Sequence, residues 1–427
     1  MQKLLLFSHN GFSDTGANGI TMKNLLSAWL PEEKAEFYCD VEKPDFSAAH
    51  HYFRVSDSQM IKALLGKKSQ HVFTYSPEQE APGEGAGKSG AKATKKIPGW
   101  LKKYKYNFCL KWAREYLWML SPWGHRKLKQ WIRDFDPDVI VYMVGESIFM
   151  DQLVLKVCRE TGKPLVLYSG EAYRIIDLKQ RRGLERAYYR KVERLYGKLN
   201  DAASLVIYNC EMLKNEYETM YPPKAESMIA YNSADCVQEP YEPGESMNIT
   251  YFGNLGVGRS DVLLETAEIL GQIDESLVLD IYGNAPAGYE ERFRSCKNIR
   301  YNGFVNPEEL RQIIGRSDIL LHVESFDEKI VPKLKYAFST KIAQCLCSGR
   351  CFVSYAPSGT ASSRYLQSVG GAAMVSRREE LKELLGRLVS DPVLRRDYAE
   401  KALAVGRKNH QKDNTARQIR ERVERIV

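Results

Sequence analysis

The chain has 427 residues, of which 44% are hydrophobic, so a disordered protein is excluded and two domains of ordinary size are expected. No run of about 18 or more apolar residues occurs, and we therefore expect no membrane-spanning helix. The net charge is +8, and its position along the chain matters more than its size.

The first residues, "MQKLLLFSHNGFSD", have an apolar stretch too short for a signal peptide and predict a first strand. Nine cysteines in a chain without an export signal favour reduced thiols and a cytoplasmic location. Cys345, Cys347 and Cys351 lie close together in the sequence, but no histidine is near them. We therefore expect buried thiols there and no metal site.

Apolar strand patterns alternate with helical patterns along most of the chain. The strands expected in the first half are 3–8, 138–145, 164–170, 204–209 and 227–232. A stretch rich in Pro, Glu and Gly at 233–246 predicts a linker. The strands expected after it are 248–256, 277–284, 318–325, 351–356 and 371–376. This alternation predicts an α/β fold with two doubly wound domains, at 1–235 and 246–408, whose ligands bind at the carboxyl ends of the strands.

A glycine-rich loop follows the first strand, in "HNGFSDTGANGIT" (9–21). Gly11, Gly16 and Gly19 let the backbone approach a ligand closely, and the helix that follows favours anions at its N-terminus. The glycines are spaced five and three apart, which is not the dinucleotide-binding spacing. A plain tight turn is the alternative.

The stretch "GEGAGKSGAKATKK" (83–96) is similar to a phosphate-binding P-loop, and a strand at 71–76 is a candidate to precede it. The first glycine of that pattern belongs at position 82, where the chain has Pro82, and no apolar helix follows. We therefore expect a flexible cationic loop and no nucleotide pocket.

Most of the positive charge lies in residues 87–133, here called the basic-aromatic segment. It contains thirteen Lys or Arg and one acidic residue, Glu115, which gives +12 and leaves about −4 for the rest of the chain. Five of the six tryptophans lie there too. Such a helix is typical of a bilayer interface, with aromatic rings at headgroup level and cations facing anionic lipid. A packed helix with a solvated basic side and an RNA-binding surface are the alternatives.

A second glycine-rich loop, "YFGNLGVGRSDVLL" (251–264), joins an apolar strand to a helix. Gly253, Gly256 and Gly258 expose backbone N–H groups, and Arg259 supplies a guanidinium at the start of the helix. Together they are suited to hold a diphosphate. An ordinary glycine-rich loop with a solvated arginine is the alternative.

The stretch "HVESFDEKIVPKLKYAFSTKIAQCLCSG" (322–349) combines acids after a strand with a cation at a helix start. Glu324 and Glu328 follow the strand, and Ser339 or Thr340 is expected to cap a helix whose first turn contains Lys341. The helix dipole disfavours a cation there unless an anion lies beside it, which predicts an anionic ligand. A solvated lysine is the alternative.

Four segments together resemble a known family: "GANGIT", "ITYFGNLGVGRSDVLLETAEIL", "NIRYNGFVNPEELRQIIGRSDILLHVES" and "FSTKIAQCLCSGRCFVSYAP". They are similar to bacterial glycosyltransferases of family 4, the two-domain GT-B enzymes, especially those of capsular and exopolysaccharide synthesis. The resemblance implies two Rossmann-like domains facing across a cleft, with the nucleotide-sugar donor in the C-terminal domain and the acceptor in the N-terminal one. It also implies a last helix, 409–427, that crosses back to the first domain, and a retaining reaction that needs no metal.

The resemblance assigns site residues by position. Arg259 and Lys341 would neutralise the departing diphosphate, because preorganised cations stabilise charge that develops in a transition state. The full assignment is catalytic Arg259, Lys341 and Glu171, and donor-binding Gly16, Gly19, Gly253, Asn254, Gly256, Gly283, Ser325, Glu328, Ser339 and Thr340, with no metal or cofactor.

Two departures from the family pattern concern acids. The usual pair of glutamates seven residues apart is absent: the second falls at Gln344, and the first falls near Tyr336, or at Glu328 if the intervening segment is an insertion. The usual His-Asp of the first domain is replaced by "YSGEAY" (168–173), where Glu171 is the nearest acid. His9 and His322, near strand ends, are expected to be structural.

The expected protein is a cytoplasmic hexosyltransferase associated with the inner face of the cell membrane. It would transfer a sugar from a nucleotide-diphosphate donor to a lipid-linked or growing oligosaccharide in polysaccharide synthesis. Its partners would be donor, acceptor and an anionic inner-membrane surface, and no nucleic acid. The alternatives are a nucleotide-sugar epimerase of similar fold and a catalytically silent, membrane-bound partner subunit. A nucleic-acid-binding protein is the most distant, because the basic stretch carries no known binding motif.

Overall fold

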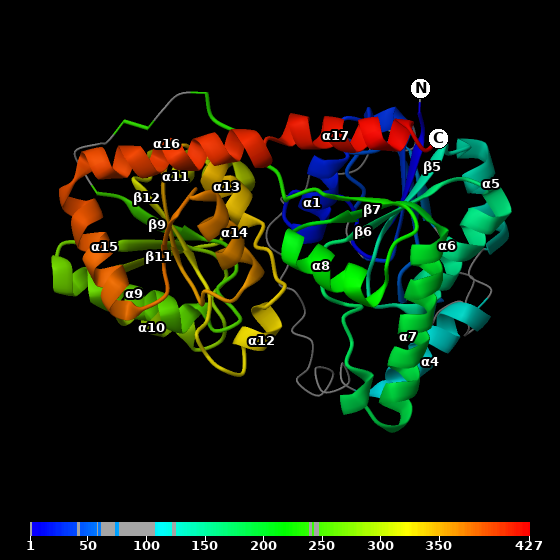
Figure 1. The fold of residues 1–427 in the computed structure, drawn as a ribbon, viewed down its shortest axis with the longest axis horizontal. Coiled ribbons are helices and arrows are strands. Elements are labelled where there is room, and N and C mark those ends of the chain that lie inside the picture. Colours follow the sequence, from blue (N-terminus) through cyan, green and yellow to red (C-terminus); the bar gives the residue numbers. More distant parts are fainter. Residues whose placement is uncertain are drawn as a thin grey trace, which may run out of the picture.

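The computed structural model describes residues 2–40, 43–57, 59–60, 73–76, 107–121, 125–238, 241–242 and 247–427. The loop expected at 83–96, and Trp100 and Trp123 of the basic-aromatic segment, lie outside the described residues. The described chain forms two α/β domains joined by a linker and by a pair of C-terminal helices (Figure 1).

The first domain is built on an eight-stranded sheet in the order β4-β3-β2-β1-β5-β6-β7-β8, in which only β4 runs antiparallel. Its strands are β1 Leu4–Phe7, β2 Lys34–Tyr38, β3 His51–Arg54, β4 Phe73–Tyr75, β5 Val139–Met143, β6 Leu165–Ser169, β7 Ala203–Tyr208 and β8 Glu226–Ile229. Its helices are α1 Ala17–Leu25, α4 Phe108–Leu120, α5 His125–Phe135, α6 Ile148–Thr161, α7 Gly183–Ala202 and α8 Glu211–Met220, with 3-10 turns η1 Pro31–Glu33 and η3 Leu178–Gln180.

The second domain is built on a six-stranded parallel sheet in the order β11-β10-β9-β12-β13-β14. Its strands are β9 Ile249–Phe252, β10 Leu279–Tyr282, β11 Ile299–Gly303, β12 Ile319–Val323, β13 Cys351–Tyr355 and β14 Ala373–Val375. Its helices are α9 Arg259–Ile273, α10 Tyr289–Ser295, α11 Pro307–Arg316, α12 Val331–Leu334, α13 Lys341–Cys347, α14 Ala361–Val369, α15 Arg378–Ser390 and α16 Pro392–Asn409, followed by α17 Lys412–Glu424.

The strand order creates one switch point in each sheet. β1 lies between β2 and β5, and β9 lies between β10 and β12, so the chain leaves each first strand in one direction and later returns on its other side. The loops after the two strands at a switch point diverge and leave room for a ligand at the carboxyl edge. The loops after β1, β5, β9 and β12 are therefore where function is expected.

The central strands form because helices cover both faces of a parallel sheet. Every residue of β5 (VIVYM) and β12 (ILLHV) is buried, as runs of β-branched and apolar residues predict. One layer of the second core contains β9, β10 and β12 side chains packed on α9 and α15. This packing fixes the positions of the strand ends.

The C-terminal helices join the two domains. α16 packs on α13 and β13 in the second domain, and α17 continues across the top of Figure 1 to pack on α1 in the first. Ile419 and Val423 of α17 lie in the core of the first domain, and Arg420 donates to Ala28 O at 2.6 Å. The expected GT-B architecture, with a last helix crossing back, is confirmed.

Hydrogen bonds at the joint between domains converge on Asn232, directly before the linker. Its side chain accepts from Thr21 of α1 (3.3 Å) and donates to Phe338 O of the second domain (3.3 Å). Buried His410, between α16 and α17, contacts Asn232 O and Tyr365 Oη at 2.7 Å each. Burial lowers the pKa of His410 to about 4, so the joint contains a neutral imidazole.

Three strands were missed from the sequence. β2 has the sequence KAEFY, whose charged residues interrupt the apolar pattern expected of a buried strand, yet all its residues are buried. Glu36 in β2 is buried because it accepts from Ser8 Oγ and from Phe12 N, which replaces its hydration. β3 is a short strand, and β11 is an edge strand whose side chains alternate between buried or half-buried and exposed.

The basic-aromatic segment forms α4 and α5 in its described part, 107–121 and 125–133. Its three described tryptophans point inward, so the expectation of outward aromatic rings is wrong for them. Trp118 stacks on Phe149 and donates to Asp57, while Trp112 and Trp131 are half-buried against neighbouring rings. Burial of these rings stabilises the first domain, since aromatic side chains contribute strongly to core packing.

A pair of helical glycines tests the packing of α16 on α13. A Cβ on Gly406 would lie 2.5 Å from Leu346 O, whereas a Cβ on Gly386 in α15 meets no atom within 4 Å. Gly406→Ala should therefore destabilise the second domain by roughly 1–3 kcal/mol through overpacking. Gly386→Ala should stabilise it by about 0.5–1 kcal/mol, because alanine favours helix. Denaturant unfolding of both variants checks this; equal effects would contradict the described α13–α16 contact.

Candidate functional site

The loop after β9 is shaped by glycines that lie close to other chain segments. Gly253 has φ 112°, and a Cβ there would lie 3.0 Å from Lys341 Cδ. Gly283, at the end of β10, has φ 149°, and its Cβ would lie 2.1 Å from Gly253 O. Side chains at these positions would push the loop away, so only glycine allows this approach.

The same loop carries backbone strain. Val257 has φ 58°, a region that β-branched residues rarely adopt, and its side chain is 45% exposed. Gly258, at φ 74°, precedes α9 as its N-cap, and no side chain caps the helix. Strain of this kind concentrates at ligand-binding loops, and uncapped helix N–H groups attract anions.

Arg259, the first residue of α9, forms a half-buried ion pair with Glu324, which follows β12. Its Nη2 lies 2.8 Å from Glu324 Oε1 and 2.7 Å from Oε2. The pair joins the two loops at the switch point of the second sheet. Nε of Arg259 is buried and, among the described residues, has no hydrogen-bond partner.

Glu324 is held by a buried histidine on its other side. His322 Nε2 lies 3.3 Å from Glu324 Oε1, and its Nδ1 lies 3.0 Å from Ser354 Oγ. Burial lowers the pKa of His322, so a neutral imidazole lies between the carboxylate and the serine hydroxyl. Burial would raise the pKa of Glu324, but the contacts with His322 and Arg259 lower it to about 2. The carboxylate is therefore fixed in place and ionised.

Lys341 lies beneath the glycine loop, in the first turn of α13. Its Nζ donates to Tyr251 Oη at 2.6 Å and lies 3.9 Å from the centre of that ring. Tyr251 Oη in turn donates to Asn254 O at 2.6 Å, which supports the loop. Burial, and then the charge of Arg259, lower the pKa of Lys341 to about 7. The structure therefore surrounds the loop with two cations and one carboxylate.

The other predicted donor-binding residues of the second domain lie around this cluster. Gly256 N donates to Asn254 Oδ1 at 2.7 Å, and Ser325 is buried under Gly258. Thr340 is the N-cap of α13 without a side-chain hydrogen bond, and Ser339 N donates to Ser362 Oγ at 3.2 Å. These five positions therefore lie in the glycine loop or directly beside Glu324 and Lys341, and their role in donor binding stays a prediction.

The glycines of the first domain lie at the start of α1. Gly16 is its N-cap, and a Cβ on Gly19 would lie 2.5 Å from Gly11 O, so the loop after β1 folds tightly onto the helix. Thr21, one turn further on, reaches Phe338 through Asn232. The glycine loop of the first domain and the start of α13 are thus linked across the domain boundary.

Two predicted acids are not part of the cluster. Glu328 is exposed, and its side chain makes no hydrogen bond or ion pair with another described residue. Glu171, after β6, has an exposed side chain, yet surrounding protein raises its pKa by burial, which indicates a recessed position. No ion pair joins either carboxylate to Arg259 or Lys341 in the described structure.

Sequence reasoning missed the partners of the two cations. Glu324 was recognised as an acid after a strand but was not chosen, and Tyr251 and His322 were not assigned a role in the cluster. The available signal was position: all three lie in or directly after the two strands that flank the switch point. Gln344, where a glutamate was expected, is half-buried on α13.

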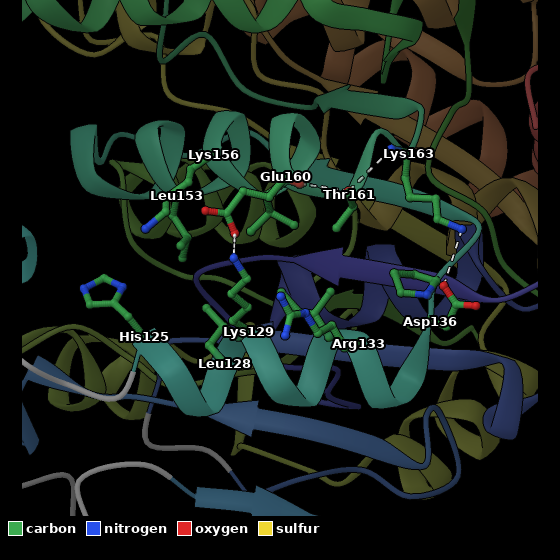
Figure 2. Close-up of a pocket in the computed structure, with 13 residues that line it drawn as sticks. His125, Leu128, Lys129, Arg133, Asp136, Leu153, Lys156, Glu160, Thr161 and Lys163 are labelled. Carbon is green, nitrogen blue, oxygen red and sulfur yellow. Dashed lines mark hydrogen bonds and ion pairs between the residues drawn. The ribbon is translucent and has the colours of Figure 1, made fainter.

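A groove of about 250 Å³ lies elsewhere, between α5 and α6 (Figure 2). Lys129 and Glu160 form an ion pair across it (3.2 Å), and Lys163 and Asp136 form another (3.5 Å). It extends along the two helices to the turns that precede β5 and β6, at the amino edge of the sheet, opposite the edge where α/β folds bind ligands. We assign it no role in donor binding.

Within the described ranges, no three His, Cys, Asp or Glu side chains gather as a metal site would require. Over the same ranges, every helix is too short or too polar to cross a bilayer.

Stability should depend on pH through Lys341. The folded pKa is about 7 and the unfolded one 10.5, so above pH 7 the unfolded chain binds a proton that the folded chain does not. The free energy of unfolding should therefore rise with pH, by at most about 1.4 kcal/mol per unit over this window. Lys341→Met lacks this contribution. Its free energy of unfolding should exceed that of wild type by the largest amount near pH 7, and the difference should shrink towards pH 10. Melting temperatures across the window check this, and a pH-independent difference would contradict it.

Comparison with known proteins identifies the architecture. Residues 259–421 match the family described as "Glycosyl transferase-like", and no curated protein matches the chain in sequence. Among solved structures, HepE from Anabaena in complex with UDP aligns with a TM-score of 0.64 at 13% identity, covering 99% of this chain and 100% of HepE. Sucrose-phosphate synthase from Thermosynechococcus elongatus aligns with a TM-score of 0.60 at 12% identity, covering 99% and 98%.

A third structure, the apo form of the lipopolysaccharide outer core galactosyltransferase WaaB, aligns with a TM-score of 0.53 at 12% identity, covering 98% of this chain and 100% of WaaB. At these identities the alignments establish the fold. The chain has the GT-B fold of two-domain glycosyltransferases, with a glycosyltransferase-like segment that contains the Arg259–Glu324 pair and Lys341.

Proposed function

We propose that the protein is a glycosyltransferase that uses a nucleoside-diphosphate sugar. The observation that carries this is the cluster at the switch point of the second sheet. Arg259 and Lys341 lie there beside a strained glycine loop. Among the described residues, Glu324 is the one carboxylate in contact with Arg259. A diphosphate is the ligand that compensates this positive charge. HepE, of the same fold, binds UDP and UDP-glucose, which supports a nucleotide-sugar donor here.

The chemistry follows from charge development. When the bond between the sugar and the diphosphate breaks, negative charge grows on the leaving phosphate. Arg259 and the N–H groups at the start of α9, which no side chain caps, stabilise that charge, because they are already oriented before reaction. Glu324 positions the guanidinium and does not contact the sugar. The reaction proceeds with retention and without a metal, as the family resemblance implies.

The acceptor side belongs to the first domain. Glu171 is accessible and its pKa is raised, so its carboxyl group is suited to contact or deprotonate an acceptor hydroxyl. We propose a lipid-linked or growing saccharide as the acceptor, in cell-surface polysaccharide synthesis at the inner face of the membrane. The basic-aromatic segment supports this, since its described part carries six Lys or Arg and one acid.

A catalytically silent partner subunit is the second candidate. It is favoured by Gln344 in place of the expected glutamate and by the position of Glu324, which already neutralises Arg259. The two candidates differ in whether the protein binds a nucleotide donor.

A thermal-shift panel with UDP, GDP, ADP, CMP and their sugars, without metal and then with Mg²⁺, tests donor binding. A ligand that binds only the folded state raises the melting temperature. Arg259→Ala should weaken the stabilising ligand by roughly tenfold to a hundredfold, because a charge-assisted hydrogen bond contributes about 1.5–3 kcal/mol. Arg387→Ala removes an exposed arginine from the far end of α15 and should leave binding unchanged.

Two outcomes would count against the transferase. Absence of any shift across the panel would favour the silent subunit. Equal affinity in Arg259→Ala and Arg387→Ala would mean that the diphosphate site is elsewhere. If a nucleotide sugar binds and is converted without any acceptor, the epimerase alternative stands instead.

Donor binding should take up a proton at Lys341. Its pKa is about 7 in the free protein, and a neighbouring diphosphate would raise it. Affinity for the nucleotide should therefore be constant below about pH 7 and fall as pH rises above it, until the raised pKa is passed. Calorimetry in buffers of different ionisation enthalpy measures the uptake. Lys341→Met should show none, and an uptake of the same size in that variant would assign the proton to another group.

A further inference from the structure

Two cysteines from distant parts of the sequence lie next to each other where the linker passes the end of α13. Cys236 belongs to the linker, and Cys347 is the last residue of α13. Val237 N donates to Cys347 O at 3.0 Å, which brings the two cysteines to the same point of the fold. Their thiols form a hydrogen bond with each other, and both are free.

Hydrogen bonds from the opposite side hold this part of the linker in place. Ala234 N donates to His410 O at 2.9 Å, and Cys236 N donates to Gln411 Oε1 at 3.2 Å. The turn between α16 and α17 therefore fixes the linker on one side while α13 contacts it on the other. The two thiols are thus kept in contact by the backbone around them.

The two thiols differ in reactivity. The hydrogen bond with Cys347, and then the charge of Arg407, lower the pKa of Cys236, although burial and the charge of Asp235 oppose this. Cys236 is half-buried, and its neighbours Asp235 and Val237 are exposed, so small solutes reach it. Cys347 is 1% exposed, and its contact with Cys236 raises its pKa. Because the thiolate is the reactive form of cysteine, an oxidant reacts with Cys236 first.

The surroundings favour oxidation chemistry over a metal site or an inert thiol. Within the described ranges, no third His, Cys, Asp or Glu side chain joins the pair as a metal ligand. Burial raises the pKa of the thiols elsewhere in both cores, which makes them unreactive: Cys39, Cys158, Cys210, Cys345 and Cys351.

We infer that Cys236 and Cys347 form an oxidation site at which a peroxide converts the two thiols into a disulfide. The Cys236 thiolate attacks one oxygen of hydrogen peroxide, so that an S–O bond forms, the O–O bond breaks, and the departing hydroxide takes up a proton to become water. The Cys347 sulfur then attacks the sulfenic acid. The S–S bond forms, the S–O bond breaks, and hydroxide leaves as water with the Cys347 proton. The thiols lose two electrons, and the peroxide gains them.

The disulfide would attach the linker covalently to the last residue of α13. Just before the start of that helix, Asn232 donates to Phe338 O, and Lys341 lies in the first turn. Oxidation would therefore stiffen the joint between the domains next to the cluster of the second domain. In a compartment that keeps thiols reduced, such a bridge is transient and reports an oxidant. The inference does not depend on the proposed function, because no nucleotide takes part in the reaction.

Treatment of the full, reduced chain with hydrogen peroxide tests the site. The remaining thiols are alkylated in denaturant and counted by mass spectrometry. Two of the nine thiols should become resistant to alkylation, and peptide mapping should give one linked pair that contains Cys236 and Cys347. The oxidised chain should melt roughly 5 °C higher than the reduced chain, since a bridge that closes a long loop restricts the unfolded state. Dithiothreitol should reverse both changes.

Single variants separate the roles of the two thiols. Cys347→Ser should let the sulfenic acid of Cys236 accumulate, and dimedone should trap it. Cys347→Ala, which buries no hydroxyl, repeats this test should the serine variant fail to fold. Cys236→Ser should leave Cys347 reduced, and peroxide should not raise its melting temperature. The matched control, Cys109→Ser, removes an exposed thiol on α4 and should form the bridge as wild type does.

Three results would overturn the inference. In the first, peroxide oxidises Cys109 while Cys236 and Cys347 both remain open to alkylation. In the second, either thiol forms its bridge with another cysteine, within one chain or between two. In the third, Cys236→Ser loses two thiols as fast as wild type. A Cys236 without a dimedone adduct in both Cys347 variants would contradict the order of attack.

Discussion

The site of the second domain depends on the burial of two cations against one carboxylate. Arg259 and Lys341 repel each other, and Glu324 contacts only the first of them. The protein accommodates this because Lys341 binds Tyr251 and loses much of its basicity, while His322 and Ser354 hold Glu324 rigid. The fold thus holds the guanidinium, the amine and the carboxylate in fixed positions, which is what electrostatic preorganisation requires.

The glycine loop and the cations determine each other. A side chain at position 253 would meet Lys341, which passes beneath the loop. Tyr251 Oη accepts a hydrogen bond from Lys341 Nζ and donates one to Asn254 O. A substitution in the loop would therefore displace the Lys341 amine, and a substitution of Lys341 would displace the loop. Val257, in the same loop, keeps a conformation that a β-branched residue avoids, as is typical of ligand-binding loops.

Sequence periodicity predicted most strands, because a parallel sheet covered on both faces needs continuous apolar runs such as VIVYM and ILLHV. It missed β2, where Glu36 is buried only because Ser8 and the Phe12 amide bind it, a contact invisible in one dimension. The same limit applies to the site. Glycine spacing and a cation at a helix start identified Arg259 and Lys341, but their partners Glu324 and Tyr251 depend on which strands are neighbours. The position of Trp118 was predicted wrongly because composition alone does not distinguish a buried ring from an exposed one.

Neutral hydrogen bonds around Asn232 join the two domains, in addition to the ion pairs Arg420–Glu33 and Arg422–Glu226 that α17 makes with the first domain. Asn232 receives Thr21 from the first domain and reaches Phe338 in the second, three residues before Lys341. His410 completes the joint as a neutral group, so none of these bonds is an ion pair that salt would weaken. Neutral bonds of this kind contribute about 1 kcal/mol each, far less than the packing within either core. The orientation of the first glycine loop toward the start of α13 therefore depends on these neutral bonds together with the packing of α17 on the first domain, and this joint lies where donor and acceptor would meet.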